Sequence, residues 1–254
     1  MAEFSISQDN FKNFISSLGK DLEDLKITVN TGVITASVGK TTHYIKRSME
    51  VGVKQTGTIN ISDLAKLKAF VNAAKGGEIT ITQASKTGTL HASCGSSKLQ
   101  LPTSSYIQSQ DKVRLLETLI SRAEESMWTS WSNCKLTHHA IVDSASLKPA
   151  GSFSKVLGGK YSCKTEFDAT SSEFTIRGGN SQKGKMFVKA SLTNVSAPEV
   201  SARSAFDNWL PDLLTNLPNG DINVYTGDET VLILEQADTS FLMVVIDQEY
   251  EEDF

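Results

Sequence analysis

The chain has 254 residues, of which 39% are hydrophobic and 21% are charged. This composition excludes a disordered tail, a collagen-like chain and low-complexity sequence, and it is typical of a globular protein that buries a sizeable core. The 25 Lys and Arg against 29 Asp and Glu give a formal net charge of −4. That balance excludes a wholly basic nucleic-acid binder but permits a local basic face.

Strands dominate the first half of the chain. Residues 25–38 predict two short strands around a hairpin turn at Asn30–Gly32, and alternation predicts further strands at 43–53, 78–83, 88–94 and 97–101. Two segments have helical spacing instead. The first is 8–18, and the second is 62–75, with Ser62 as the expected N-cap and Gly76–Gly77 as the stop. Their apolar faces contain Phe11, Phe14, Ile15, Leu18, Leu64, Leu67, Phe70, Val71 and Ala74.

The second half repeats this order. Residues 152–158 predict a short helix with Phe153, Val156 and Leu157, and 164–177 and 185–195 alternate like strands. Residues 204–217 predict a helix that Pro211 interrupts, and three strands follow. An offset of 143 residues places the following residues of the first half on apolar or glycine positions of the second: Leu67, Phe70, Val71, Ala74, Gly77, Ile79 and Ile81 fall on Leu210, Leu213, Leu214, Leu217, Gly220, Ile222 and Val224. One offset across a helix and a strand indicates a duplicated domain.

We therefore expect an α+β protein with one domain at 1–102, a connector at 103–134 and a second domain at 135–254. The connector predicts a helix over 111–125, because Val113, Leu116, Leu119, Ile120 and Ala123 share one helical face. That face either packs on the sheets or forms a surface for a partner.

Motifs for chemistry are largely missing from the sequence. GNSQKGK at 179–185 has the glycine spacing of a phosphate loop, but Met186 follows where such loops have Ser or Thr, and strands rather than a helix flank it. His138 and His139 point to opposite sides of a strand and form a poor metal set with Cys134. His43 has no evident acidic partner. We expect no catalysis, no metal and no cofactor.

Cellular context follows from the cysteines and the apolar segments. Cys94, Cys134 and Cys163 have no CxxC spacing, which favours a reducing compartment without a disulfide framework. Residues 1–11 lack the pattern of a signal peptide, and no stretch approaches about 18 uncharged apolar residues. We expect a cytoplasmic protein that is not secreted and has no membrane partner.

Charge is unevenly distributed between the predicted helices and the rest of the chain. The segments 8–20, 61–75, 144–160 and 203–217 contain nine basic and four acidic residues, a balance of +5, so the remainder carries −9. If these helices share one side of the sheets, that side is basic and can attract a phosphate backbone without recognising bases. The alternative is that the lysines only decorate solvent-facing helix positions.

Taken together, the duplicated pattern resembles the DNA sliding clamps with two domains per chain, such as proliferating cell nuclear antigen and the phage T4-type clamp. The most specific segments are GVITASVGKTTHYIKRSMEV, INISDLAKLKAFVNAAKGGEITI and FLMVVIDQEYEEDF. The short acidic tail is similar to that of phage clamps and suggests a viral source. The connector is longer than is usual in this family, and the fourth helix is acidic at Asp207 and Asp212.

The resemblance implies a homotrimeric ring of six similar domains, with two helices per domain on the inner face and antiparallel sheets outside. Double-stranded DNA, bound without sequence preference, would pass through the channel, and a DNA polymerase and a clamp loader would be further partners. The implied channel residues are Lys12, Lys20, Lys66, Lys68, Lys75, Lys148, Lys155, Lys160 and Arg203.

Two further surfaces are implied by the same resemblance. Edge strands would join the subunits, through Lys98, Leu99, Leu101, Met186, Phe187, Val188 and Leu192. A hydrophobic pocket would receive short partner peptides, and its positions here are Thr42, His43, Tyr44, Ile45, Met127, Trp128, Ile246 and Tyr250.

Three alternatives remain open from the sequence. The chain could be a clamp-fold processivity factor that works as a monomer or dimer and contacts DNA directly. It could be an enzyme that uses the GNSQKGK loop on a nucleotide. It could also be a structural β protein with duplicated domains and no dependence on DNA.

Overall fold

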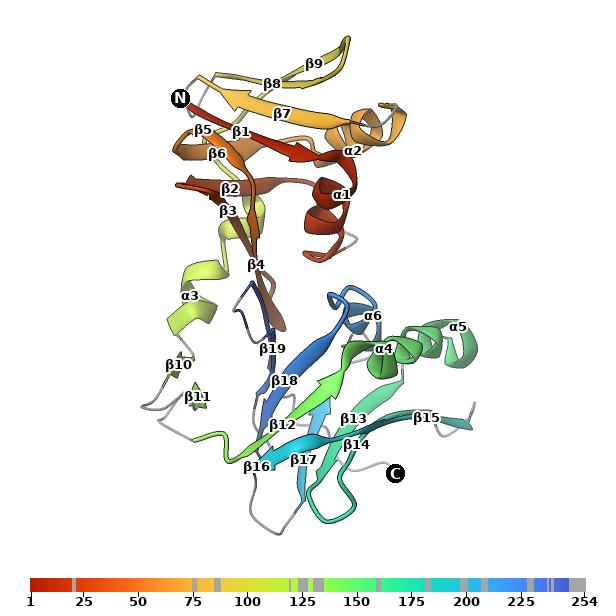
Figure 1. Cartoon of the computed structure of the whole chain (residues 1–254). Helices are drawn as coiled ribbons and strands as arrows, with labels where there is room; N and C mark the ends of the chain where they lie inside the picture. The colour runs from red at the N-terminus through yellow and green to blue at the C-terminus, as the bar shows by residue number, and fades with distance from the viewer. Residues whose placement is uncertain are drawn as a thin grey trace. The chain divides into compact units, whose positions relative to one another are not determined.

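The computed structural model describes the chain except for residues 20–21, 75–76, 85–87, 119, 123–127, 130–134, 159–160, 181–183, 197–200, 207–209, 228–230, 237, 239 and 247–254. The chain divides into two compact units, Met1–Arg114 (unit 1) and Leu115–Phe254 (unit 2), and each is described by itself. Figure 1 shows both units with their helices and strands labelled.

Unit 1 builds two antiparallel sheets. Its strands are β1 (Ala2–Ser7), β2 (Leu25–Asn30), β3 (Val33–Gly39), β4 (His43–Glu50), β5 (Gly52–Gln55), β6 (Gly57–Ile61), β7 (Glu78–Gln83), β8 (Thr89–Cys94) and β9 (Ser97–Pro102). One sheet has the order β5-β1-β7-β8-β9, and the other runs β4-β3-β2-β6. The alternation Leu25, Ile27 and Val29 in β2 buries every second side chain, as a half-buried strand requires.

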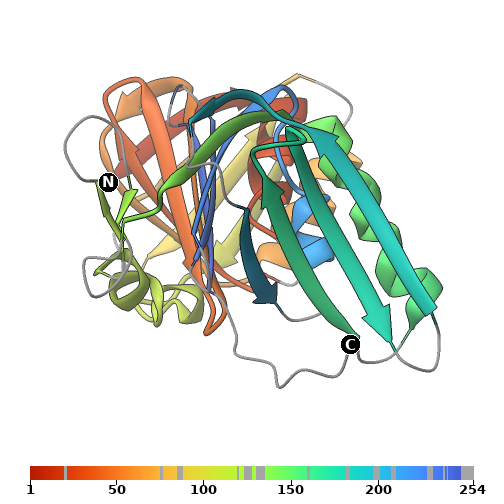
Figure 2. The ribbon, with the colours of Figure 1, turned by 90° about the horizontal axis from the view of Figure 1, so that it is seen from below.

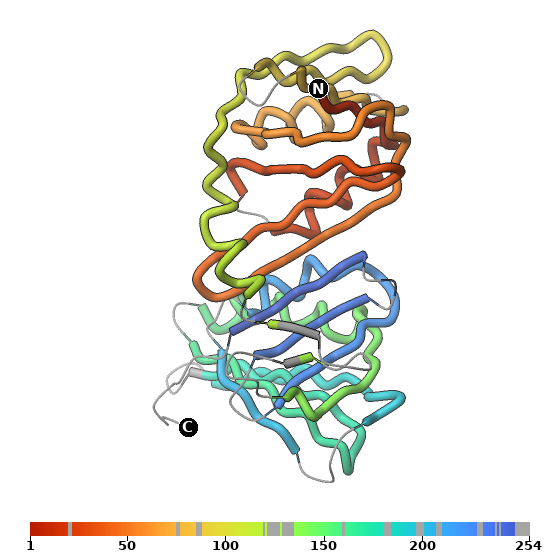
Figure 3. The backbone as a smooth tube through the Cα atoms, turned by 90° about the vertical axis from the view of Figure 1, so that its left-hand side faces the viewer, coloured from red at the N-terminus to blue at the C-terminus, as the bar shows by residue number. Residues whose placement is uncertain are grey.

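Helices α1 (Gln8–Ser16) and α2 (Leu64–Ala73) contact each other within unit 1. After β9 come η1 (Gln108–Gln110) and α3 (Val113–Thr118). Figure 3 shows this yellow-green segment running along the strands of unit 1. The Asp24 carboxylate accepts hydrogen bonds from the backbone N–H groups of Gln108 (2.5 Å) and Ser109 (3.0 Å). The Gln110 side chain donates to the carbonyl of Ser37 at 2.5 Å, so these residues are anchored on unit 1.

Unit 2 repeats the topology of unit 1. Its strands are β10 (Ser121–Arg122), β11 (Trp128–Thr129), β12 (His138–Asp143), β13 (Ser162–Asp168), β14 (Glu173–Asn180), β15 (Gly184–Ser191), β16 (Thr193–Ser196), β17 (Ala202–Phe206), β18 (Asp221–Thr226), β19 (Leu232–Gln236) and β20 (Phe241–Val245). Within the unit the orders are β16-β12-β18-β19-β20 and β15-β14-β13-β17. Both orders match those of unit 1 strand for strand, which confirms the duplicated α+β architecture with antiparallel sheets.

The helical part of unit 2 is more broken. It consists of α4 (Ser144–Leu147), η4 (Lys148–Ser152) and α5 (Phe153–Leu157) in place of α1, and of α6 (Leu210–Leu214) in place of α2. Figure 2 shows the green helical segment lying alongside the teal strands, and α5 contacts both β14 and β15. Phe153 is fully buried there, as expected, whereas Val156 is 63% exposed. The expected apolar face of this helix therefore contains Phe153 and Leu157 only.

Several predicted boundaries were wrong. The segment 164–177 is part of a hairpin of β13 and β14 rather than one alternating stretch. The predicted helix at 204–217 contains strand β17, and α6 begins only at Leu210, because proline favours the first turn of a helix over its interior. The predicted connector helix over 111–125 is helical at Val113–Thr118 and is followed by the short pair β10–β11.

None of the helices in the described part of the chain has the length and apolar character needed to span a bilayer. Cys94 and Cys163 are buried thiols, and burial raises the pKa of Cys163. Cys134 lies outside the described residues.

Candidate nucleic-acid interface

Helix α1 presents one apolar and one polar side. Ser7 caps it, because its Oγ accepts a hydrogen bond from the backbone N–H of Asn10 at 3.3 Å. Phe11, Phe14 and Ile15 are buried at helical spacing, as the sequence predicted. Lys12 flanks this buried face and is partly exposed.

Helix α2 is built in the same way. Asp63, not the predicted Ser62, is the N-cap, and its Oδ1 accepts from the backbone N–H of Lys66 at 2.9 Å. The Lys66 ammonium also pairs with Asp63 Oδ2 at 2.8 Å. The side-chain hydrogen bond from Lys66 lowers the pKa of the Asp63 carboxyl. Lys66 is therefore partly neutralised by the N-cap of its own helix.

One buried side chain ties the two helices together. Gln8, at the start of α1, donates its Nε2 hydrogen bonds to the carbonyls of Val71 and Ala74 at the end of α2, the latter at 2.9 Å. These carbonyls belong to the last turn of the helix, where no intrahelical donor is left for them. The backbone N–H of Gln8 donates to the carbonyl of Gly77 at 3.0 Å. These bonds fix the separation of α1 and α2.

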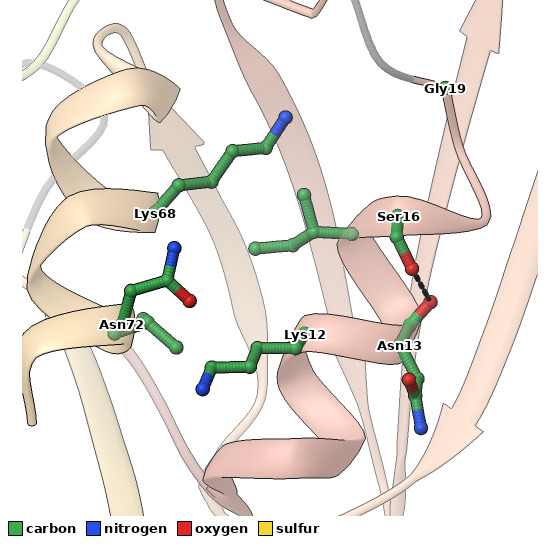
Figure 4. A pocket seen from close by; sticks show the side chains of 8 residues that line it. Lys12, Asn13, Ser16, Gly19, Lys68 and Asn72 are labelled. Carbon is green, nitrogen blue, oxygen red and sulfur yellow. Dashed lines mark hydrogen bonds between the residues drawn. The ribbon is translucent and has the colours of Figure 1, made fainter. Parts of the chain in front are cut away.

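A groove of about 350 Å³ lies between these helices (the α1–α2 groove). The described residues that line it are Lys12, Asn13, Ile15, Ser16, Gly19, Lys68, Val71 and Asn72. In Figure 4, Lys12 extends from α1 towards α2, and Lys68 and Asn72 extend from α2 into the gap. The groove is thus lined by apolar side chains as well as by polar ones, and both helices contribute to it.

In unit 2, the two helical segments approach each other closely, whereas in unit 1 a groove separates α1 from α2. A side chain at Gly151 of η4 would place its Cβ 2.0 Å from Cγ2 of Thr215, so any larger residue at this position would force the Thr215 side chain to move. Ser154 of α5 donates to the Asp212 carboxylate of α6 at 3.1 Å. This contact adds a negative charge to the surface that corresponds to the α1–α2 groove.

The other expected channel residues have varied surroundings. Lys148 donates to Asn219 Oδ1 at 2.5 Å, and Lys155 lies in the last turn of α5. Arg203 was expected on a helix but lies on β17, where its guanidinium donates to Glu166 Oε1 at 3.1 and 2.7 Å. It is thus held by an acid of the neighbouring strand. Lys20, Lys75 and Lys160 lie outside the described residues.

The residues expected in the partner-peptide pocket are mostly buried. Thr42 precedes β4, and its Oγ1 lies 3.1 Å from His43 Nδ1. His43, Tyr44 and Ile45 are all buried, and Tyr44 shares a hydrogen bond with Ser37 at 3.2 Å. Burial, with a smaller effect of Lys40, lowers the pKa of His43 to about 4, so the imidazole is neutral at pH 7. Ile246 is partly exposed, and Met127 and Tyr250 lie outside the described residues.

Trp128 is a buried anchor for the segment before β12. Only 7% of the residue is exposed, and its Nε1 donates to Glu235 Oε2 of β19 at 3.3 Å. The backbone N–H of Leu136 donates to the carbonyl of Trp128 at 3.0 Å. A tryptophan held in this way contributes packing and a hydrogen bond to unit 2.

The expected interface residues lie on or beside two strands at sheet edges. Lys98, Leu99 and Leu101 are on β9, which ends the order β5-β1-β7-β8-β9, and Leu101 is buried. Met186, Phe187 and Val188 are on β15, which ends the order β15-β14-β13-β17, and buried Leu192 follows it. Phe187 is 52% exposed, with the Arg177 guanidinium 5.1 Å from its ring centroid. Each edge therefore combines backbone pairing groups with apolar side chains.

The loop at 179–185 connects two antiparallel strands, because Asn180 of β14 pairs with Gly184 of β15. Strands therefore flank this loop on both sides, as the sequence predicted, whereas a phosphate-binding loop leads into a helix. Among the described residues, no group of three His, Cys, Asp or Glu side chains is placed to hold a metal ion.

Sequence reasoning missed Asn72 and the role of Gln8. Lys12 and Lys68 were found from helix charge, but nothing in the pattern indicated that they share one groove. A buried Gln directly after a strand, as at Gln8, is an unusual signal, because glutamine is mostly exposed in proteins. It could have indicated a contact between helices.

The whole chain has the fold of DNA polymerase sliding clamps. It matches the DNA polymerase III subunit beta of Pseudomonas aeruginosa with a TM-score of 0.70 and 13% identity, over 98% of this chain and 66% of that one. The match to the Helicobacter pylori beta clamp bound to a DNA ligase peptide has a TM-score of 0.66 and 10% identity, over 99% and 68%. The chain thus spans about two thirds of the length of these bacterial beta clamps.

A second kind of clamp matches this chain over its own full length as well. PCNA from Thermococcus kodakaraensis matches with a TM-score of 0.67 and 14% identity, over 97% of this chain and 99% of that chain. The resemblance to sliding clamps drawn from the sequence is therefore confirmed at the level of the fold, and this chain and the PCNA chain cover almost the whole of each other. No protein-family model matches the sequence, and no curated protein matches it.

Proposed function

We propose that the protein is a DNA polymerase sliding clamp, a processivity factor that encircles duplex DNA as a homotrimeric ring. The observation that carries this proposal is the exact repetition of one strand order in both units, in a chain that covers 99% of a PCNA chain. Three such chains supply six similar units. Closed cyclic symmetry would pair the edge strands β9 and β15 of every chain with a neighbouring chain.

The subunit contact in this proposal joins β9 of one chain to β15 of the next. Both strands end their sheets, and neither is covered by another strand in the described part of its unit. Phe187, Met186 and Val188 would supply apolar contact on one side, with Leu99 on the other.

The helices would face the DNA, and their role would be electrostatic. Lys12, Lys66, Lys68, Lys148 and Lys155 are described cations of the helical layers. Such contacts with phosphates carry no sequence information, which suits a protein that must slide. Processivity would come from topological enclosure, which keeps a tethered polymerase at a high local concentration.

Partner proteins would be a replicative polymerase and a clamp loader, recruited through short peptides. The Helicobacter pylori beta clamp bound to a DNA ligase peptide supports this mode of recruitment. The protein would be a scaffold without enzymatic activity, cofactor or metal, and it would act in the cytoplasm, in a host cell if its source is viral.

End-dependent DNA binding tests the ring. The purified protein is incubated with a linear plasmid that has free ends, with the same plasmid blocked at both ends by a bulky protein, and with its relaxed circular form. A closed ring threads from free ends only, so binding to the free linear form should greatly exceed binding to the other two. Equal binding to all three forms would overturn the ring and favour direct contact by a monomer or dimer.

A further inference from the structure

We propose that Asn219 is a site of self-modification, at which the backbone nitrogen of Gly220 converts the Asn219 side-chain amide into an acid and the Lys148 ammonium group accelerates the reaction. Asn219 and Gly220 lie between α6 and β18 of unit 2, and Lys148 is the first residue of η4. The inference stands apart from the proposed function, because it depends only on the chemistry and contacts of this turn.

The sequence singles out this turn. Asn219–Gly220 is the only Asn-Gly pair in the chain. Asparagine is a thermolabile residue, because the backbone nitrogen of the next residue can attack its side-chain amide. A glycine in the next position leaves that nitrogen unshielded, since it has no Cβ. Both residues are exposed, so water reaches the amide and the leaving group can depart.

The backbone on either side of the reacting nitrogen is held in place. The carbonyl of Gly220 accepts a hydrogen bond from the backbone N–H of Ser144 at 3.0 Å, and the carbonyl of Asn219 accepts one from Gln236 Nε2 at 3.4 Å. The backbone N–H of Gly220 itself has no acceptor among the described residues. Attack by this nitrogen therefore breaks no hydrogen bond within the described part of the turn.

Lys148 contacts the oxygen on which charge develops. Its Nζ donates a hydrogen bond to Asn219 Oδ1 at 2.5 Å. Attack on Cγ of Asn219 moves negative charge onto this oxygen. A donor that is already in place stabilises such a charge, as the N–H groups of an oxyanion hole do. Because the donor is a cation, the hydrogen bond becomes stronger as the charge grows.

The reaction needs no reagent except water. Solvent hydroxide removes the proton from the Gly220 nitrogen, which then forms a bond to Cγ of Asn219. The bond from Cγ to Nδ2 breaks, and Nδ2 takes up a proton from water and leaves as ammonia, which regenerates hydroxide. Water then opens the resulting succinimide ring at either carbonyl, which leaves an aspartate or an isoaspartate at position 219.

The corresponding turn of unit 1 cannot react in this way. Gly77 corresponds to Gly220, because its carbonyl accepts from the backbone N–H of Gln8 at 3.0 Å, as that of Gly220 accepts from Ser144. The residue before it is Gly76, which has no side-chain amide. Conversion at this turn would therefore add a negative charge to unit 2 alone, beside Lys148. Isoaspartate would also lengthen the main chain between α6 and β18.

The test follows the conversion of Asn219 by mass spectrometry of protease fragments, after the folded protein has been incubated in mildly alkaline buffer. Lys148→Met removes the donor, and Lys148→Arg supplies another cationic one. Lys155→Met is the matched control, since it also removes one cation from the helical part of unit 2. The wild type and Lys155→Met should convert about threefold faster than Lys148→Met, because solvent screens so exposed a contact. Lys148→Arg should recover most of the rate.

The same incubation in urea shows whether the fold is the cause. Unfolding separates Lys148 from Asn219, so all four proteins should then convert at one rate. Equal rates of the folded wild type and folded Lys148→Met would overturn the inference, as would a difference that persists in urea. It would also fail if Asn219 converted in urea but stayed intact in the folded wild type. The urea midpoint of each variant checks that it is folded, and Lys148→Gln, which keeps a neutral donor, should have an intermediate rate.

Discussion

Units 1 and 2 share one strand order but differ in their helical layers. Unit 1 has two continuous helices, α1 with nine residues and α2 with ten. Unit 2 has a segment broken at Pro149 in place of the first, and the five-residue α6 with Pro211 in place of the second. The sheets therefore tolerate different helices, and the surface that we assign to DNA is the part that has diverged.

The largest expected effect compares how much a buried phenylalanine in the helical layer of each unit contributes to the free energy of unfolding. Phe11 of α1 and Phe153 of α5 are fully buried at corresponding positions. Replacing either one by alanine should cost about 3–5 kcal/mol of the free energy of unfolding, because each change leaves a large cavity. Urea denaturation measures this. Val156→Ala is the control, since Val156 is exposed and should change stability by less than about 0.5 kcal/mol.

The second prediction concerns acid stability of unit 1. His43 has its folded-state pKa lowered to about 4 by burial, below the unfolded value of 6.5. Below pH 6.5, His43 is protonated in the unfolded chain but stays neutral in the folded chain. The free energy of unfolding therefore decreases as the pH falls from 6.5 towards 4. The loss approaches about 3 kcal/mol at full shift.

His43→Asn should remove this component. The difference in unfolding free energy between the wild type and the variant should shrink from pH 7 to pH 4. A difference that is constant over this range would show that His43 is not the group responsible.

The third prediction weakens the link that keeps the groove open. Gln8→Leu leaves the carbonyls of Val71 and Ala74 without their buried donor, and should cost about 2 kcal/mol. Gln55→Leu, on an exposed position of β5, should leave the free energy of unfolding unchanged. A free energy of unfolding of Gln8→Leu equal to that of the wild type would show that these bonds do not stabilise unit 1.

The smallest expected effect concerns the closed layer of unit 2. Gly151→Ala forces Thr215 to move and should cost about 1 kcal/mol. Adding Thr215→Ser removes the Cγ2 atom but keeps the hydroxyl, which bonds to the carbonyl of Asp212. The double variant should recover most of the loss in urea denaturation. A double variant as unstable as Gly151→Ala alone would show that the contact with Thr215 Cγ2 does not cause the loss of stability.

Periodicity explains how much of the fold was predictable. Periodic patterns in the sequence predict strands such as β2, in which Leu25, Ile27 and Val29 alternate with polar residues. They also predict the apolar face of α1. The duplication of the domain was predicted from a single offset of 143 residues between the two halves of the sequence. The boundaries near Arg203 and Pro211 failed, because a short strand and a short helix lie too close together for an apolar pattern to separate them.

The groove was predictable only in part. The charges of Lys12 and Lys68 are visible in the sequence, but their shared opening depends on the bonds from Gln8 to Val71 and Ala74, which join residues more than 60 positions apart. The closure of unit 2 depends on the contact of Gly151 with Thr215, which is equally distant in sequence. Tertiary contacts of this kind leave no periodic signal.

The solution mass of the purified protein tests the central claim most directly. Light scattering after size exclusion, at several concentrations, should give a species of about 83 kDa, three times the chain mass of 27.6 kDa. A chain that remains near 28 kDa at every concentration would contradict a ring that closes by itself.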